Sequence, residues 1–168
     1  MITKNQLIKK LNDSRITFQL HEHEALFTVK DSEKKRGSIE GVHTKNLFLK
    51  NKKKEYFLFS CEEKQSVNIK KLSKSLVLGN LSFAKEVALK EYLNITPGSV
   101  TPFGLLNDIE NKVNFFLDNN LTQDDQINFH PLENTATITM QVKDFINFLL
   151  ENNKKVNIFD FKSYTLIK

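Results

Sequence analysis

The sequence has little cysteine, proline and glycine, and it has no tryptophan and no long apolar run. A single thiol, Cys61, excludes an internal disulfide framework and is typical of a reducing compartment, so a cytoplasmic protein is expected. No apolar stretch reaches the roughly 18 residues that a membrane-spanning helix needs. The N-terminus is polar and lacks an apolar core segment, so we expect neither a signal peptide nor a membrane partner.

Several motifs with well-defined chemistry are also missing. The chain has no Gly-x-Gly-x-x-Gly, no P-loop, no Gly-x-Ser-x-Gly elbow and no His-Glu-x-x-His. Cys61 has no histidine beside it in the sequence, which favours a core thiol over a nucleophile. His21 and His23 share one face of an expected strand, but no second ligand pair has zinc-like spacing, so no metal site is predicted.

What the chain has in abundance is lysine. The formal net charge is +5, and every basic residue except Arg15 and Arg36 is a lysine. Lysine is a mobile point charge that suits phosphate oxygens better than planar base edges, which indicates contact with a nucleic-acid backbone. Solubility alone would explain the same charge, and composition does not separate the two interpretations. The bases cluster at 34–36, 50–54, 70–74 and 154–155.

The periodicity of apolar residues predicts one domain, 1–168, that mixes helices with short strands. Turns between the central strands are too short for parallel crossovers, so we predict an α/β or α+β fold. Its central sheet is expected to be mixed, largely antiparallel and surrounded by helices. A charged stretch at 30–42 is expected to cross the surface. Helices are predicted at 2–13, 66–75, 82–92 and 141–152, and strands at 16–21, 45–50, 56–60, 113–117, 127–130, 135–139 and 156–159.

A lysine and an asparagine stand together at the start of the apolar run 45–50. Burying an ammonium without a partner is costly, so Lys45 indicates an anionic ligand. Asn46 adds a donor and an acceptor, and we expect both side chains to point the same way if the pair begins the strand. The alternative is a turn residue followed by a solvent-facing lysine, and the pair alone does not decide.

Two further segments are candidates for a site. The loop 96–104 holds two of the three prolines and two of the five glycines. Gly98 permits a positive φ and close approach to a ligand, and Pro102 fixes the turn that follows, so the loop can present backbone groups at a fixed place. His130 ends an expected strand. The alternatives are an ordinary connector for the loop and a structural histidine bonded to a neighbouring loop.

Three segments, taken in order, resemble the YbaK family of aminoacyl-tRNA deacylases, which is related to the editing domain of bacterial prolyl-tRNA synthetase. They are 44–49 (Thr-Lys-Asn-Leu-Phe-Leu), 98–104 (Gly-Ser-Val-Thr-Pro-Phe-Gly) and 129–137 (Phe-His-Pro-Leu-Glu-Asn-Thr-Ala-Thr). The last segment and the Pro-Phe-Gly loop are most similar to the free-standing ProX, or PrdX, branch. The similarity extends over nearly the whole chain and implies the fold of that editing domain.

The resemblance implies a trans-editing hydrolase that removes a wrong amino acid from the 3′ end of tRNA(Pro). The implied substrate is alanyl-tRNA(Pro): discrimination by pocket size supplies only about 1–3 kcal/mol, so a second hydrolytic sieve is useful. The alternatives are cysteinyl-tRNA(Pro) deacylation, a non-catalytic tRNA- or synthetase-binding module, and hydrolysis of another small ester or amide. The implied partners are mischarged tRNA(Pro) and prolyl-tRNA synthetase, with a monomer or weak homodimer and no metal or organic cofactor.

The resemblance also implies roles for individual residues. Lys45 would bind a phosphate or the terminal adenosine, and Asn46 would orient the aminoacyl end. The loop at Gly98 would offer backbone groups to the α-amine and to the attacking water. His130 would line the pocket and set its size; it is not assigned as a general base, because the sequence shows no carboxylate that would tune it. The expected substrate-binding residues are Ser99, Val100, Thr101, Pro102 and Phe103.

Overall fold

The structure is a computed structural model that describes residues 1–26, 28, 30, 34 and 39–167. The predicted surface course of 30–42, with Gly37 and the bases Lys35 and Arg36, lies mostly outside these residues. Among the described helices, none has the length and apolar character that crossing a membrane requires.

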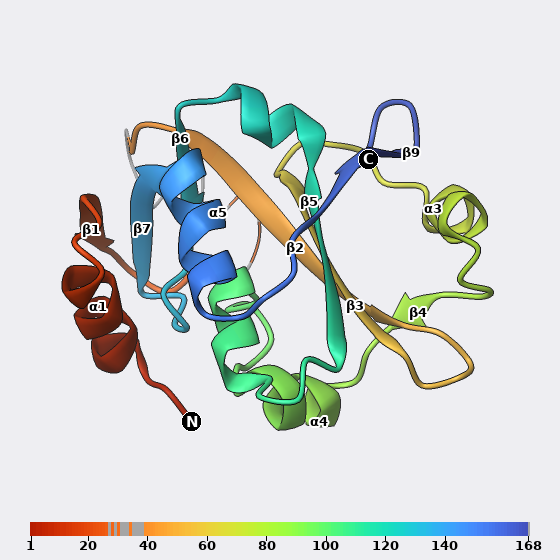
Figure 1. Ribbon diagram of the computed structural model, residues 1–168, viewed down its shortest axis with the longest axis horizontal. Coiled ribbons are helices and arrows are strands. Elements are labelled where there is room, and N and C mark those ends of the chain that lie inside the picture. The colour runs from red at the N-terminus through yellow and green to blue at the C-terminus, as the bar shows by residue number, and fades with distance from the viewer. Residues whose placement is uncertain (27, 29, 31–33, 35–38, 168) are drawn as a thin grey trace.

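A nine-stranded mixed sheet runs through the molecule, in the order β1-β7-β6-β2-β3-β5-β8-β9, with β4 beside β2 (Figure 1). Five pairings are antiparallel, and three (β2–β6, β3–β5 and β5–β8) are parallel. This confirms the predicted mixed, largely antiparallel sheet. The strands are β1 (Phe18–Glu22), β2 (Val42–Lys50), β3 (Tyr56–Glu62), β4 (Ser82–Phe83), β5 (Val113–Asp118), β6 (Gln126–Phe129), β7 (Ala136–Gln141), β8 (Asn157–Asp160) and β9 (Thr165–Ile167).

The helices lie around this sheet and follow the sequence prediction in most places. The predicted capping box is present: the Thr3 N–H donates to the Gln6 side chain at 2.9 Å, and the Gln6 N–H donates to Thr3 Oγ1. Such a box satisfies two of the backbone donors that a helix start leaves open. The helical segments are α1 (Lys4–Asp13), α3 (Ile69–Leu76), α4 (Glu86–Ala88), the π-helix η1 (Leu89–Leu93), the 3₁₀-helices η2 (Pro102–Asn107) and η3 (Asn119–Gln123), and α5 (Val142–Glu151).

The prediction of one helix over 82–92 is wrong in its first part. Ser82 and Phe83 form β4, paired with β2, and the helix begins only at Glu86. Pairing with an existing strand edge stabilises an extended backbone whatever the local propensity, and no local pattern announces it. The short strand β9 was not predicted either.

The two faces of the central strands carry separate cores. Phe48 and Leu58 belong to one core, which includes Phe145 of α5. Leu49 and Phe59 belong to the other, which includes Leu72 of α3. Figure 1 shows α5 close to β7 and α3 on the far side of the molecule, beyond β3 and β4. Phe48 and Leu49 of β2 are buried, one on each face, whereas residues 42–47 are only half-buried.

Candidate functional site at an edge of β2

Along one edge, β2 is flanked by two short strands that do not meet. β6 runs parallel to β2 and pairs only with Val42 and His43. β4 runs antiparallel and pairs with Leu49 and Lys50, and the Ala84 N–H extends this contact to the Phe48 carbonyl. Between them, residues 44–47 have no strand partner on this edge within the described part of the chain.

We call this unpaired stretch, residues 44–47 between the ends of β4 and β6, the β2 notch. Because β6 is parallel to β2 and β4 is antiparallel, the carboxyl ends of both strands point into it. In Figure 1, β2 is the long orange strand, with β6 near one end and β4 near the other. The Phe48 carbonyl faces β4, so by alternation the peptide groups of Asn46 also face this edge. A break of this kind leaves backbone donors and acceptors available to a ligand.

Lys45 and Asn46 lie within the notch, but they point to opposite faces of the sheet. Lys45 is opposite Cys61 of β3, whose side chain belongs to the core beneath α3. Asn46 is opposite Ser60 and lies on the other face. The expectation that both side chains point the same way is wrong, since the pair sits in mid-strand, where successive side chains alternate.

The Asn46 amide is held on both sides. Its Nδ2 donates to the Val100 carbonyl at 3.1 Å, and its Oδ1 accepts from the hydroxyl of the buried Ser60. These bonds fix which end of the amide points to the loop. The side chain therefore fastens the loop 98–102 to β2.

Thr44 fastens β6, which leads into the third segment, in a similar way. Its hydroxyl donates to the Asn128 carbonyl at 2.7 Å, which joins β2 to the end of β6 just before His130. Segments 44–49 and 98–104 are therefore in contact, and the third segment, 129–137, begins one residue after the contact at Asn128. Local patterns had predicted each segment but not their contacts.

The loop has the shaped turn that its composition predicts. The Ser99 N–H donates to the Thr96 carbonyl at 3.1 Å, and Gly98 has a φ of +86° at the third position, after Pro97. Proline followed by a glycine of positive φ is the signature of a type II turn. Thr101 then begins η2 by accepting from the Phe103 N–H.

Most of the predicted substrate-binding side chains in this loop are buried. The Phe103 ring is fully buried and stands edge-on to Phe129 and Phe145, with ring centroids 6.1 and 5.8 Å apart. Its side chain is a core element, so the loop offers mainly backbone groups at the notch. Ser99, Thr101 and Pro102 are buried, and Val100 is half-buried.

His130 follows β6 and is half-buried. Its Nδ1 lies 2.9 Å from the Ala136 carbonyl. A carbonyl only accepts, so Nδ1 carries the proton, and the lone pair of the neutral ring is on Nε2.

Sequence reasoning missed His23 as a neighbour of His130. The two rings stand edge-on with centroids 6.4 Å apart. The His23 Nδ1 donates to the Glu24 carbonyl at 2.8 Å, so its Nε2 accepts from the Thr137 hydroxyl, also at 2.8 Å. Thr137, the last residue of the third family segment, bonds to His23 and belongs to the same segment as His130, so it is the residue that links the two histidines.

Lys45 is half-buried, and no carboxylate of the described residues lies within ion-pairing distance of its ammonium. Burial raises the pKa of the neighbouring Cys61 thiol to about 12, and the positive charge of Lys45 opposes this rise. Cys61 is therefore a neutral core thiol, as predicted. Among the described residues, no three His, Cys, Asp or Glu side chains are placed to hold a metal ion.

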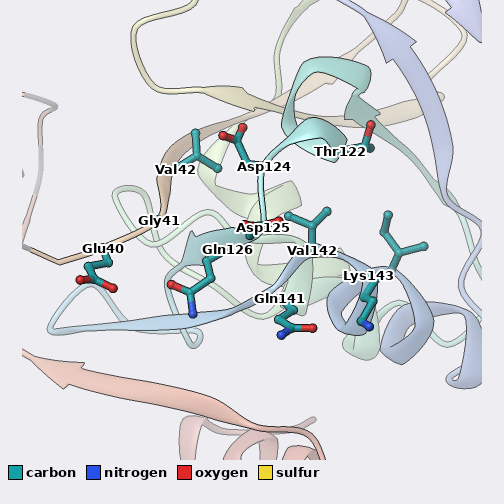
Figure 2. Close-up of a pocket in the computed structure, with 11 residues that line it drawn as sticks. Glu40, Gly41, Val42, Thr122, Asp124, Asp125, Gln126, Gln141, Val142 and Lys143 are labelled. Atoms are coloured by element: carbon teal, nitrogen blue, oxygen red, sulfur yellow. The ribbon is translucent and has the colours of Figure 1, made fainter.

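A cavity of about 1040 Å³ lies at the N-terminal end of β2 and is separate from the β2 notch (Figure 2). It lies beside Val42 and the start of α5, and none of the predicted site residues lines it. Its lining includes the carboxylates of Glu40, Asp124 and Asp125. A cavity with this charge does not suit an anionic ligand.

Known proteins similar to this chain agree on one family. Residues 23–148 match the aminoacyl-tRNA editing domain. The chain is 35% identical to the prolyl-tRNA editing protein ProX of Acetoanaerobium sticklandii, over 99% of each chain. It is 34% identical to the prolyl-tRNA synthetase associated domain-containing protein 1 of Bos taurus, over 92% of this chain and 93% of that protein.

Solved structures share the fold. A crystal structure described as that of a candidate trans-editing enzyme for prolyl-tRNA synthetase superposes with a TM-score of 0.67 at 19% identity, over 100% of this chain and 99% of that one. The hypothetical protein APE2540 superposes with a TM-score of 0.69 at 14% identity, over 92% of this chain and 97% of that one.

Proposed function

This chain belongs to the aminoacyl-tRNA editing domain family and acts as a deacylase in prolyl-tRNA editing, and we propose that its substrate is alanyl-tRNA(Pro). The observation that carries the proposal is the β2 notch. There Lys45, whose ammonium has no carboxylate partner among the described residues, lies on one face of the strand, and Asn46 holds the loop of fixed backbone groups on the other. Thr44 bonds to Asn128, two residues before His130. An anionic 3′ end that carries a small amino acid with an uncharged side chain fits that chemistry.

Lys45 is the residue that binds the nucleic acid in this proposal. The Lys45 ammonium has no carboxylate partner within the described part of the chain, and a phosphate in the notch would supply the negative charge instead. This ion pair would anchor the ester relative to the loop. Lysine suits this task, because it has a flexible stem and a compact charge.

Asn46 takes a different part from the one that the family resemblance implies. Both ends of its amide are already engaged, by Ser60 and by Val100. We infer that its side chain positions the loop, while its peptide N–H and carbonyl face the substrate. A peptide N–H at this edge is suited to stabilise negative charge on the ester oxygen as water attacks.

The reaction needs no covalent enzyme intermediate. Water adds to the ester carbonyl carbon, the C–O bond to the ribose breaks, and the ribose oxygen takes up a proton as alanine leaves with its carboxyl group. An aminoacyl ester is already reactive, so positioning and oxyanion contacts supply most of the acceleration. His130 borders this space and limits the size of the amino acid.

The test is deacylation of tRNA(Pro) charged in turn with alanine, cysteine and proline by the purified protein. We expect rapid loss of the alanyl ester and persistence of the prolyl ester. Preferential hydrolysis of the cysteinyl ester would move the substrate to cysteine. Tight tRNA binding with all three esters intact would instead identify a binding module and overturn the proposal.

A further inference from the structure

We propose that the tRNA leaves the notch in one direction, along β2 toward β4 and the β2–β3 turn. This inference rests on the proposed function and adds to it a surface that the tRNA contacts. We call it the basic turn surface; it consists of Lys50, Lys52, Lys53, Lys54, Phe83 and Lys85.

The first support is uncompensated charge. Lys52, Lys53 and Lys54 are exposed in the turn, and Lys85 is exposed just after β4. No carboxylate of the described residues lies within ion-pairing distance of any lysine of this surface. A set of unpaired lysines at a protruding turn attracts a phosphate backbone.

The second support is Phe83, an aromatic ring that is 59% exposed. Phe83 is opposite Leu49 on β4, the strand that borders the notch. Three residue steps along the strand lead from Asn46 to Leu49, or roughly 10 Å. That is about the length of three stacked nucleotides at 3.4 Å each. An exposed ring at this distance suits stacking against a base of the unpaired 3′ end.

The third support is the opposite end of β2, where the charge is reversed. The cavity there presents Glu40, Asp124 and Asp125, with Lys143 as the basic residue of its lining (Figure 2). The strand thus runs from an acidic end to a basic end, with Lys45 between them. Repulsion at one end and attraction at the other set the direction in which a polyanion lies.

The first experiment compares two triple variants of the full chain that remove equal charge. One is Lys52→Gln/Lys53→Gln/Lys85→Gln; Lys54 is left in place because its φ is +60°. The control is Lys10→Gln/Lys155→Gln/Lys162→Gln, three exposed lysines outside this surface and outside the acidic cavity. The probe is uncharged tRNA(Pro), and the readout is the Kd by fluorescence anisotropy between 50 and 200 mM salt.

We expect the first variant to bind roughly tenfold more weakly. The slope of the logarithm of the binding constant against the logarithm of the salt concentration should be shallower by about 0.7–0.9 for each phosphate that the variant no longer neutralises. The control should bind within about twofold of the unmodified protein, since scattered surface charges contribute little at this salt. Equal binding by both variants, or a larger loss in the control, would overturn the proposed path.

Phe83 has its own test, with a single-stranded oligonucleotide that carries the 3′ sequence of the tRNA. Phe83→Ala should weaken binding roughly tenfold, while Phe83→Tyr should retain it, because a tyrosine ring also stacks. Equal affinity for Phe83→Ala and the unmodified protein would remove the ring from the path.

Failure of this inference and failure of the proposed function are distinguishable. A short alanylated oligonucleotide that does not reach the turn should be hydrolysed equally by the first triple variant and the unmodified protein. If no ester is hydrolysed but tRNA binding weakens as expected, the surface stands and the proposed function falls. If alanyl-tRNA(Pro) is hydrolysed with equal efficiency by both triple variants, the function stands and the path falls.

Discussion

At the scale of single residues, Lys45 and Asn46 point to opposite faces of one strand and have different proposed roles, phosphate binding for Lys45 and positioning of the loop for Asn46. Asn46 is engaged by Ser60 and Val100, so the loop depends on it. Lys45 has no such bonds to its ammonium among the described residues. The sequence identified both residues but not their directions. β2 begins at Val42, three residues before the predicted strand. The polar residues His43 and Thr44 interrupt the apolar pattern, so the start of the strand was not recognised and the pair was placed at its beginning.

Cys61 gives a prediction about pH. Its pKa is raised from 9.0 to about 12 by burial, so the folded state keeps a proton that the unfolded chain releases. Stability from this group is complete below pH 9 and is lost as pH rises from 9 toward 12, by up to about 1.4 kcal/mol per pH unit.

The measurement is urea unfolding of the unmodified protein and of Cys61→Ala between pH 8 and 10.5. The difference in unfolding free energy between them should narrow as pH rises, because the alanine variant lacks this titration. A constant difference across that range would show that the thiol does not titrate differently in the two states. The cavity left by the alanine lowers the unfolding free energy by the same amount at every pH, so it does not change the slope of that free energy against pH, which is the quantity compared.

At the scale of elements, hairpins and amphipathic helices were readable from local pattern. The β2–β3 hairpin and α5 follow from apolar periodicity close by in the sequence. β4 was not readable, because its two residues are extended only through pairing with β2. The same limit hid the gap between β4 and β6, which is a relation among three strands.

The turn at Gly98 is the element whose geometry the site depends on most. A side chain at its φ of +86° strains the backbone by roughly 1–2 kcal/mol. Gly98→Ala should therefore lower the melting temperature by several degrees. It should also lower deacylation at least tenfold, because the Val100 carbonyl and its neighbours shift from the notch.

Gly79→Ala is a matched control for that variant. Gly79 has a φ of +75°, and an added Cβ there would meet no atom within 4 Å, so it introduces similar strain without a clash. Both variants should lose similar stability, while only Gly98→Ala loses activity. Equal loss of deacylation in the two would show that activity merely follows stability.

At the scale of the whole molecule, the site arises from incomplete coverage of one strand in a sheet that is otherwise continuous. The parallel pairing of β2 with β6 joins segments more than eighty residues apart and stops after two residues. Such distant pairing leaves no local signature, so the fold class was predictable and the strand order was not. Likewise, the composition predicted a basic protein, but not that charge changes sign along β2.

The central claim is that the β2 notch, anchored by Lys45, is where the ester is hydrolysed. The most direct test is the second-order rate constant for alanyl-tRNA(Pro) deacylation by the unmodified protein, Lys45→Ala and Lys10→Ala. This constant reports transition-state interactions relative to free enzyme and substrate. We predict a loss of roughly 100-fold for Lys45→Ala at unchanged thermal stability, and a constant for Lys10→Ala within twofold of the unmodified protein. A Lys45→Ala variant as active as the unmodified protein would contradict the account.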